Sequence, residues 1–190
     1  NGNQPCLGKT LLASLIAILV DGHPPYPITY TSDGAEFEKQ LATRVKLGDN
    51  MILIDNVDAT VIESSVLDRS VTGAVLNFRL LGANDSINMS NSVLFAMSVN
   101  DGVLSRDLVS RCVPIHLYWE GPADRRVFKR SNLEGFVLEN RWAILEELVG
   151  MVTRWVEAGR PMVETRPTRF GDWSPIIGSI LVFNGVDGFL

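Results

Sequence analysis

Three consecutive residues near the start of the sequence, Gly8, Lys9 and Thr10, have the types that a phosphate-binding loop needs. In the pattern G-x-x-x-x-G-K-[ST], glycine lets the backbone approach phosphate oxygens, lysine reaches the β- and γ-phosphates and the hydroxyl binds Mg²⁺. Asn3 stands where the first glycine belongs, and asparagine tolerates a left-handed backbone better than most residues. An ordinary helix start is the alternative interpretation of these residues taken alone.

A carboxylate follows the next strongly apolar segment. Residues 51–54 are a continuous apolar run, and Asp55 comes directly after them. At the carboxyl end of a buried parallel strand, a carboxylate lies opposite a phosphate loop and can serve the Mg²⁺ ion. Together the two segments predict ATP with Mg²⁺ as ligands. The predicted metal residues are Thr10 and Asp55, and the predicted nucleotide residues are Asn3, Gly8, Lys9 and Thr10.

Two residues farther along the chain are candidates for contacts with the γ-phosphate. Asn100 follows a predicted strand, where its side chain would help to orient water, and a turn residue is the alternative. Arg111 closes a predicted short helix at the edge of the domain, where it would reach the nucleotide of a neighbouring subunit. A surface salt bridge is the alternative for Arg111, and Arg106 is its rival for the same role.

The residue that activates the attacking water is left open by the sequence. Asn56 follows Asp55, so the usual acidic neighbour is absent. Asp58, Glu36 and Glu63 are the three candidates, and nothing in their spacing chooses among them.

Hydrophobic patterning predicts strands and helices in alternation. The expected strands cover residues 28–31, 51–54, 93–99 and 113–117, the expected helices cover 9–20, 35–47, 62–71 and 106–111, and a hairpin covers 77–89. This order is typical of a parallel sheet with helices on both faces. We therefore expect an α/β core over residues 1–120. Because a phosphate loop normally follows a strand, we also expect the first strand of that core to precede this sequence.

Beyond residue 120 the pattern becomes helical. Residues 136–158 form one long helical stretch with Trp142 and Trp155 on a single apolar face, and a last helix is expected within residues 171–190. Residues 121–190 are therefore predicted to form a small helical lid, with both tryptophans in its core.

Composition limits the class of protein. The 190 residues carry a net charge of −5, and 46% of them are hydrophobic, which describes a packed globular chain. No apolar run reaches the ~20 residues that span a bilayer, and the two cysteines are too few for a disulfide framework. We expect a cytoplasmic protein without a membrane partner. Any nucleic-acid surface must be local at this net charge.

Four segments resemble the ATPase part of replication proteins of phages, plasmids and integrated elements. They read Gly-Lys-Thr-Leu-Leu-Ala, Ile-Leu-Ile-Asp-Asn-Val, Phe-Arg-Leu-Leu-Gly, and Ser-Val-Asn-Asp-Gly-Val-Leu-Ser-Arg-Asp-Leu-Val-Ser-Arg-Cys-Val-Pro-Ile-His-Leu. Those proteins carry a P-loop NTPase module of AAA+ type, related to superfamily 3 helicases and often preceded by a primase domain. The sequence departs from the family pattern at Asn3, Cys6 and Asn56.

The resemblance implies an ATP-dependent DNA helicase or translocase that acts on single-stranded or forked DNA as a ring, expected to be a hexamer, with a primase domain upstream. It assigns Lys9, Asp55, Asn100 and Arg111 to catalysis and places the 78–89 hairpin where such helicases carry a DNA-touching loop. The alternatives are an AAA+ switch or assembly ATPase that acts on a protein partner, and a small-molecule phosphotransferase on the same loop.

The remaining polar residues are weaker candidates. His23 and His116 have no metal-ligand partner at suitable spacing and are interpreted as structural. A basic cluster at residues 125–130 faces either solvent or DNA, and we favour solvent.

Overall fold

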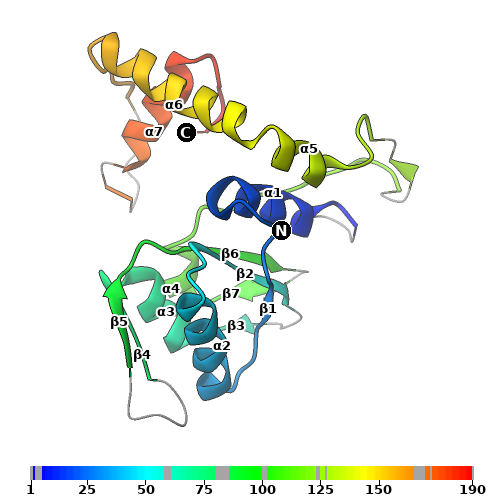
Figure 1. The fold of residues 1–190 in the computed structure, drawn as a ribbon, viewed down its shortest axis with the longest axis vertical. Coiled ribbons are helices and arrows are strands. Elements are labelled where there is room, and N and C mark those ends of the chain that lie inside the picture. The colour runs from blue at the N-terminus through cyan, green and yellow to red at the C-terminus, as the bar shows by residue number, and fades with distance from the viewer. Residues whose placement is uncertain are drawn as a thin grey trace. The chain divides into compact units, whose positions relative to one another are not determined.

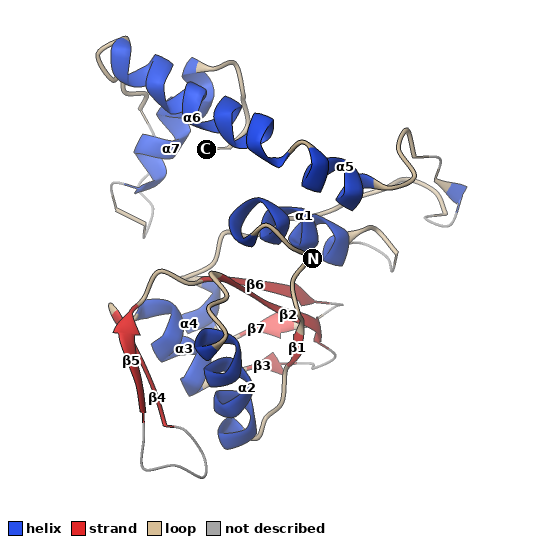
Figure 2. Cartoon of the chain, in the orientation of Figure 1, coloured by secondary structure: helices blue, strands red, loops and turns tan. Residues whose placement is uncertain are grey.

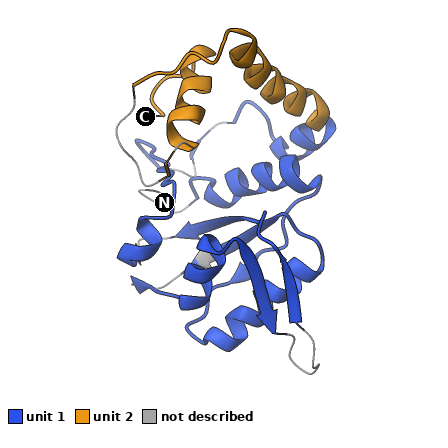
Figure 3. Cartoon of the chain, turned by 90° about the vertical axis from the view of Figure 1, so that its left-hand side faces the viewer, with its two compact units in different colours: residues 1–139 blue, residues 140–190 orange. Residues whose placement is uncertain are grey.

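The computed structural model divides the chain into two compact units, residues 1–139 and residues 140–190 (Figure 3). It describes residues 2, 6–57, 61–79, 86–99, 102–122, 125–126, 128–164, 170–171 and 173–189, with Asn56 described by its backbone alone. The first unit extends beyond residue 120, where the sequence predicts the core to end. It does so because helix α5 (Leu133–Glu139) packs against helix α1 (Lys9–Asp21).

A three-stranded parallel sheet forms the centre of the first unit (Figure 2). Its strands lie in the order β1 (Ile28–Thr29), β2 (Met51–Val57) and β6 (Leu94–Val99). Parallel neighbours need a long crossover, which is usually a helix, and α2 (Gly34–Lys46) is the crossover from β1 to β2. The predicted α/β fold with a parallel sheet is confirmed, although β1 is shorter than the predicted 28–31.

Strand β2 is buried on both faces, which explains its continuous apolar sequence. Ile52 and Ile54 belong to the main core, which α2 and α3 (Ser65–Thr72) also line. Met51 and Leu53 are buried as well and alternate to the opposite face, where α1 contacts β2 and β6. Figure 1 shows α1 on one side of the sheet and α2 and α3 on the other. Helices therefore cover both faces, as predicted.

Side-chain caps start the helices on the α2 side of the sheet. Asp33 accepts hydrogen bonds from two first-turn N–H groups of α2. Ser64 and Ser105 each cap one helix in the same way, α3 and the short α4 (Arg106–Val109). Because α4 ends at Val109, Arg111 follows it in a turn and does not close the helix as predicted.

The predicted hairpin is present. Strands β4 (Val75–Arg79) and β5 (Ser86–Ser90) pair in antiparallel register, and its tip, residues 80–85, lies outside the described residues. Leu76 and Phe78 are buried in the main core, and α2 contacts β4. One face of the hairpin is therefore fixed to the core, and the other consists of alternating exposed residues.

A second, very short parallel pair was not predicted. Strand β3 (Val61–Ile62) pairs with β7 (Val103–Leu104), and the Tyr30 hydroxyl donates to the Glu63 carbonyl at 2.8 Å. Two-residue strands are too short to give a periodic signal. Because β3 occupies residues 61–62, α3 starts at Ser65 rather than at the predicted residue 62.

Residues 113–117 do not form the strand that the sequence predicts. In the part of the chain that the structure describes, their only bridge joins Leu117 to Gly2 in parallel, and Val113 and Ile115 are exposed. A strand needs a neighbouring backbone for its ladder of hydrogen bonds, and a single bridge supplies too little of one. The apolar pattern indicated strand propensity but not the partner that a strand requires.

The second unit consists of α6 (Arg141–Glu157) packed against α7 (Trp173–Phe183). The single helix predicted over residues 136–158 is wrong, because a turn at Asn140 separates α5 from α6. The last helix is confirmed within its predicted range. Every helix in the described residues lacks the combination of length and apolar character that crossing a membrane requires.

The two tryptophans of α6 differ in burial. Trp155 is 6% exposed, and its Nε1 donates to the Pro161 carbonyl at 2.9 Å. Trp142 is 76% exposed, so the prediction that both lie in the core is correct only for Trp155. The reason is the position of α7: Asn184, just after α7, bonds to Met151 in the carboxyl half of α6, far from Trp142.

Helix α1 is tied to the start of β2 by one carboxylate at its carboxyl end. Asp21 Oδ1 accepts hydrogen bonds from the backbone N–H and the side-chain amide of Asn50, at 3.0 and 2.9 Å. Its Oδ2 accepts from the Met51 N–H at 3.0 Å. Three hydrogen bonds to an ionised acceptor are worth more than neutral ones, so this contact fixes where α1 lies along the sheet.

We expect Asp21→Asn to lower the free energy of unfolding by about 1–3 kcal/mol, because the new amide nitrogen would face the Met51 N–H, donor against donor. Urea denaturation followed by circular dichroism measures the change. Asp107→Asn, at an exposed position in α4, is the matched control and should shift stability by less than about 0.5 kcal/mol. Equal shifts for the two variants would show that the Asp21 contacts contribute nothing specific.

Candidate functional site

The chain enters α1 through a tight loop with two left-handed residues. Cys6 has φ 61° and Gly8 has φ 88°, and alternation of such residues with right-handed ones turns backbone N–H groups toward a common side. Gly8 is the N-cap of α1, which has neither a side-chain cap nor an acidic residue in its first turn within the described residues. The first-turn N–H groups and the positive end of the helix are therefore available to an anion.

Thr10 and Asp55, which are 45 residues apart in sequence, are in direct contact. The Thr10 hydroxyl lies 3.0 Å from Asp55 Oδ1 and 3.3 Å from Oδ2, and it donates to this carboxylate. Thr10 is in the first turn of α1 and Asp55 is near the carboxyl end of β2, beside Thr29 of β1. The sequence predicted both residues as metal ligands, and the fold brings them together.

The anchor at Asp21 and the contact at Thr10 hold the two ends of α1 against the two ends of the apolar part of β2. From Thr10 to Asp21 the helix rises roughly 16 Å, and from Met51 to Asp55 the strand rises roughly 13 Å. The small difference is within the reach of the two aspartate side chains. The phosphate loop is thereby held over the edge of the sheet at which Asp55 lies.

Lys9, the predicted phosphate ligand, is half-buried in the first position of α1. It has no hydrogen-bond or ion-pair partner among the described residues. A lysine without a partner beside unoccupied helix N–H groups adds positive charge to the same place. Asn3 and Asn100, which the sequence also assigned to this site, lie outside the residues that the structure describes.

Arg111 is paired within its own chain. Its Nη1 lies 2.9 Å from Asp68 Oδ1 of α3, and the two side chains are 35% and 22% exposed. The alternative that the sequence left open, a surface salt bridge, is therefore present in this structure. Its rival Arg106 is exposed at the start of α4. Contact of Arg111 with another anion requires this pair to separate.

The three candidates for activating water have different surroundings. Glu36 forms an ion pair with Lys39 at 3.3 Å on α2. Glu63 has an exposed side chain, and its backbone is held by the Tyr30 hydroxyl on both the carbonyl and the N–H. Asp58 lies outside the described residues. The structure therefore leaves Glu63 as the described candidate without an ion-pair partner.

The basic cluster is only partly a solvent-facing surface. Arg126 Nη1 donates to the Leu7 carbonyl in the phosphate loop at 3.1 Å, and the Arg130 guanidinium lies 3.8 Å from the centre of the Phe136 ring. Sequence reasoning treated these residues as one cluster and missed the contact of Arg126. The aromatic residues on both sides of Arg126, Trp119 and Phe128, were the available signal.

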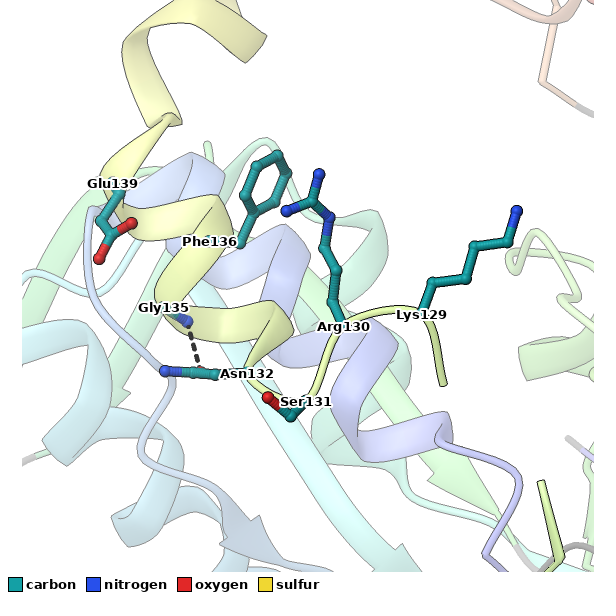
Figure 4. A pocket seen from close by; sticks show the side chains of 7 residues that line it. All are labelled: Lys129, Arg130, Ser131, Asn132, Gly135, Phe136 and Glu139. Atoms are coloured by element: carbon teal, nitrogen blue, oxygen red, sulfur yellow. Dashed lines mark hydrogen bonds between the residues drawn. The ribbon is translucent and has the colours of Figure 1, made fainter. Parts of the chain in front are cut away.

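Arg130 also lines an open hollow at the start of α5 (Figure 4). Asn132 closes the floor of this hollow by accepting a hydrogen bond from the Gly135 N–H at 2.8 Å. In the figure, Lys129 extends away from the hollow, and Glu139 lies at the other end of it. Neither Thr10 nor Asp55 lines the hollow, so it is separate from the contact between these two residues.

His23 has a local structural role. His23 Nδ1 lies 2.8 Å from the Pro24 carbonyl, and its ring lies against Tyr26. No group of three or more His, Cys, Asp or Glu side chains is arranged to hold a metal ion among the residues described. A cation that binds here would therefore depend on ligands beyond Thr10 and Asp55.

Comparisons with known proteins add no relative. No protein-family model matches the chain, and neither a curated protein nor a solved structure matches it significantly. The function proposed below therefore rests on the residues and geometry of the chain together with the resemblance of its motifs.

Asp68 also acts on a neighbour of Arg111. Burial raises the pKa of the Cys112 thiol, and the negative charge of Asp68 raises that pKa further. Cys6, by contrast, is an exposed thiol in the phosphate loop. The reactive form of a cysteine is the thiolate, so the two cysteines should differ in reactivity.

We expect iodoacetamide at pH 7.5 to modify Cys6 at least about tenfold faster than Cys112, because Cys112 is both shielded and less ionised. The rate at Cys112 should continue to rise above pH 9 as its thiolate forms. Asp68→Asn should raise the Cys112 rate by removing the charge that opposes ionisation. Peptide mass spectrometry measures both sites in one sample, and equal rates in the folded protein would contradict the assignment.

Proposed function

We propose that this chain binds ATP with Mg²⁺ and hydrolyses it as the P-loop, AAA+ type motor of a DNA helicase or translocase that works as a ring. The single observation that carries the nucleotide part is the contact between the Thr10 hydroxyl and the Asp55 carboxylate. It joins the residue after the loop lysine to the carboxylate at the end of the neighbouring buried strand, which is the combination a triphosphate with Mg²⁺ requires.

The donor atoms at this contact suit magnesium. A hydroxyl and a carboxylate are hard oxygen ligands, and Mg²⁺ in nucleotide sites takes one or two protein oxygens, with phosphate oxygens and water completing its shell. When bound, Mg²⁺ would neutralise phosphate charge. Thr10 and Asp55 would hold it, and two protein ligands make its binding depend on the nucleotide.

The remaining roles follow from position. The N–H groups of the α1 first turn and the left-handed Gly8 bind phosphate oxygens, and Lys9 adds a charge that is unpaired among the described residues. Of the three candidate acids, Glu63 is the described one without an ion-pair partner, and it is proposed to orient the attacking water. Arg111 is proposed to act on the nucleotide of a neighbouring subunit after leaving Asp68.

The DNA part of the proposal is supported by the hairpin and by the resemblance of the motifs. Asn77 and Arg79 of β4 are exposed and alternate with buried residues, and Asn88 of β5 is exposed as well. The Asn77 amide donates to Asn88 Oδ1 at 3.3 Å, so these side chains share one face. No acidic residue is present among the described residues of this face. Amide groups and an arginine there suit contacts with phosphate and sugar.

We expect Lys9→Ala to weaken binding of a fluorescent ATP analogue with Mg²⁺ by at least about tenfold, because a charge-assisted contact to phosphate is lost. Fluorescence anisotropy of the chain with and without EDTA measures the affinity. Lys46→Ala is the matched control. Lys46 is exposed at the carboxyl end of α2, which leads into the start of β2, whereas Asp55 is near the other end of that strand. Undiminished binding by Lys9→Ala would make the site assignment wrong.

We expect single-stranded DNA to stimulate ATP hydrolysis, and Arg79→Ala to reduce this stimulation while leaving hydrolysis without DNA unchanged. If Arg79 contacts one phosphate, the variant should also lower the slope of log affinity against log salt by about one. Steady-state ATPase rates and DNA titrations at several salt concentrations measure both. ATP hydrolysis that DNA does not stimulate would favour the alternative, an AAA+ ATPase acting on a protein partner.

A further inference from the structure

The side chain of Arg126, in the carboxyl-terminal part of the first unit, contacts the phosphate loop. Its Nη1 donates to the Leu7 carbonyl at 3.1 Å, across 119 positions of sequence. The guanidinium carbon also lies 5.0 Å from the Trp119 ring centre and 5.0 Å from that of Phe128. Two aromatic rings and one carbonyl thus fix the plane and the direction of this guanidinium.

The carbonyl that Arg126 holds belongs to the peptide unit between Leu7 and Gly8. There are no cis peptide bonds among the described residues, and in a trans peptide the C=O and the following N–H point in opposite directions. A guanidinium that fixes the Leu7 carbonyl on one side therefore fixes the Gly8 N–H on the other. Leu7 is buried, so its side chain also limits rotation of this peptide unit.

Gly8 itself sets little steric limit on rotation of this peptide. Its φ of 88° lies in the left-handed region, which glycine enters without the steric cost of a side chain. Rotation of the Leu7 to Gly8 peptide would move the N–H out of the loop and bring a carbonyl oxygen in. A carbonyl directed at a phosphate oxygen repels it, so the orientation of this one peptide decides whether the loop accepts an anion.

We propose that Arg126 is a positioning residue of the phosphate loop, which turns the Gly8 N–H inward by holding the Leu7 carbonyl outward. This inference rests on the proposed function, in which the loop binds the phosphates of ATP. Arg126 itself donates to the protein backbone and contacts no nucleotide atom in this role. Trp119 and Phe128 act through Arg126 by holding its plane.

The geometry also distinguishes arginine from other donors. Lysine carries the same charge, but its ammonium has no plane to lie against an aromatic ring and no fixed donor direction. Glutamine has a planar donor without charge and a shorter side chain. Arg126→Lys should therefore recover part of the function that Arg126→Ala loses, and Arg126→Gln should recover less than lysine does.

The experiment measures the Gly8 amide directly and ATP binding in parallel. In the ¹⁵N-labelled chain, Arg126→Ala should shift the Gly8 amide resonance, with resonances of α2 unchanged. Affinity for the fluorescent ATP analogue with Mg²⁺ should fall about tenfold, or about 1.4 kcal/mol. Arg125→Ala, which removes an exposed neighbouring arginine, is the matched control and should change neither quantity.

The outcomes separate this inference from the proposed function. If the unmodified chain binds the ATP analogue and Arg126→Ala binds it equally well, the positioning role is overturned and the proposed function stands. If the unmodified chain does not bind the analogue, the proposed function fails. An unchanged Gly8 resonance in Arg126→Ala also overturns the inference, whatever the affinity. If Arg126→Ala fails to fold, the α2 resonances will shift as well. Arg126→Lys then tests the inference, which predicts partial recovery of ATP binding in that variant.

Discussion

The structure depends on one constraint: helix α1 is tied to strand β2 at both ends. Asp21 holds the carboxyl end against Asn50 and Met51 at the start of the strand, and Thr10 meets Asp55 near its carboxyl end. These contacts add to the packing of α1 against β2, β6 and α5 and set its position along the strand. The helix N-terminus and its unpaired N–H groups are thereby held beside the Asp55 carboxylate. Lys9 and the positive end of the helix dipole both favour the binding of an anion at this place.

Burial of β2 on both faces explains why that constraint is firm. Met51 and Leu53 are covered on the α1 side and Ile52 and Ile54 on the α2 side, all with almost no exposed surface. A one-residue shift in register would exchange the side chains of the two faces. Asp55, the first polar residue after this run, is thus placed by the packing of the four residues before it.

The sequence predicted those features of the fold that depend on local pattern. The apolar run before Asp55, the helix after Gly8 and the hairpin all have short-range signals, and all are present. The failures concern partners distant in sequence. Residues 113–117 have strand propensity without a ladder, and Trp142 lies on an apolar helix face that α7 does not cover. In the site, the pairing of Thr10 with Asp55 followed from topology. The contact of Arg126 with Leu7 joins residues 119 positions apart, and its only sequence signal is the pair of aromatic residues near Arg126.

The arginine pairs of the first unit differ in how easily they exchange partners. Arg44 and Asp49 are 2.6 Å apart with side chains only 14% and 8% exposed, and Arg44 also lies over the Tyr26 ring. Breaking such a buried pair leaves an uncompensated charge, which costs several kcal/mol, so it is structural. The Arg111 pair with Asp68 is more exposed, and exposed pairs are worth about 1 kcal/mol or less. Arg111 can therefore exchange Asp68 for a more highly charged anion at small cost, whereas Arg44 cannot leave Asp49. If the proposed ring forms, this difference in burial selects Arg111 over Arg44 as the arginine able to serve a neighbouring nucleotide.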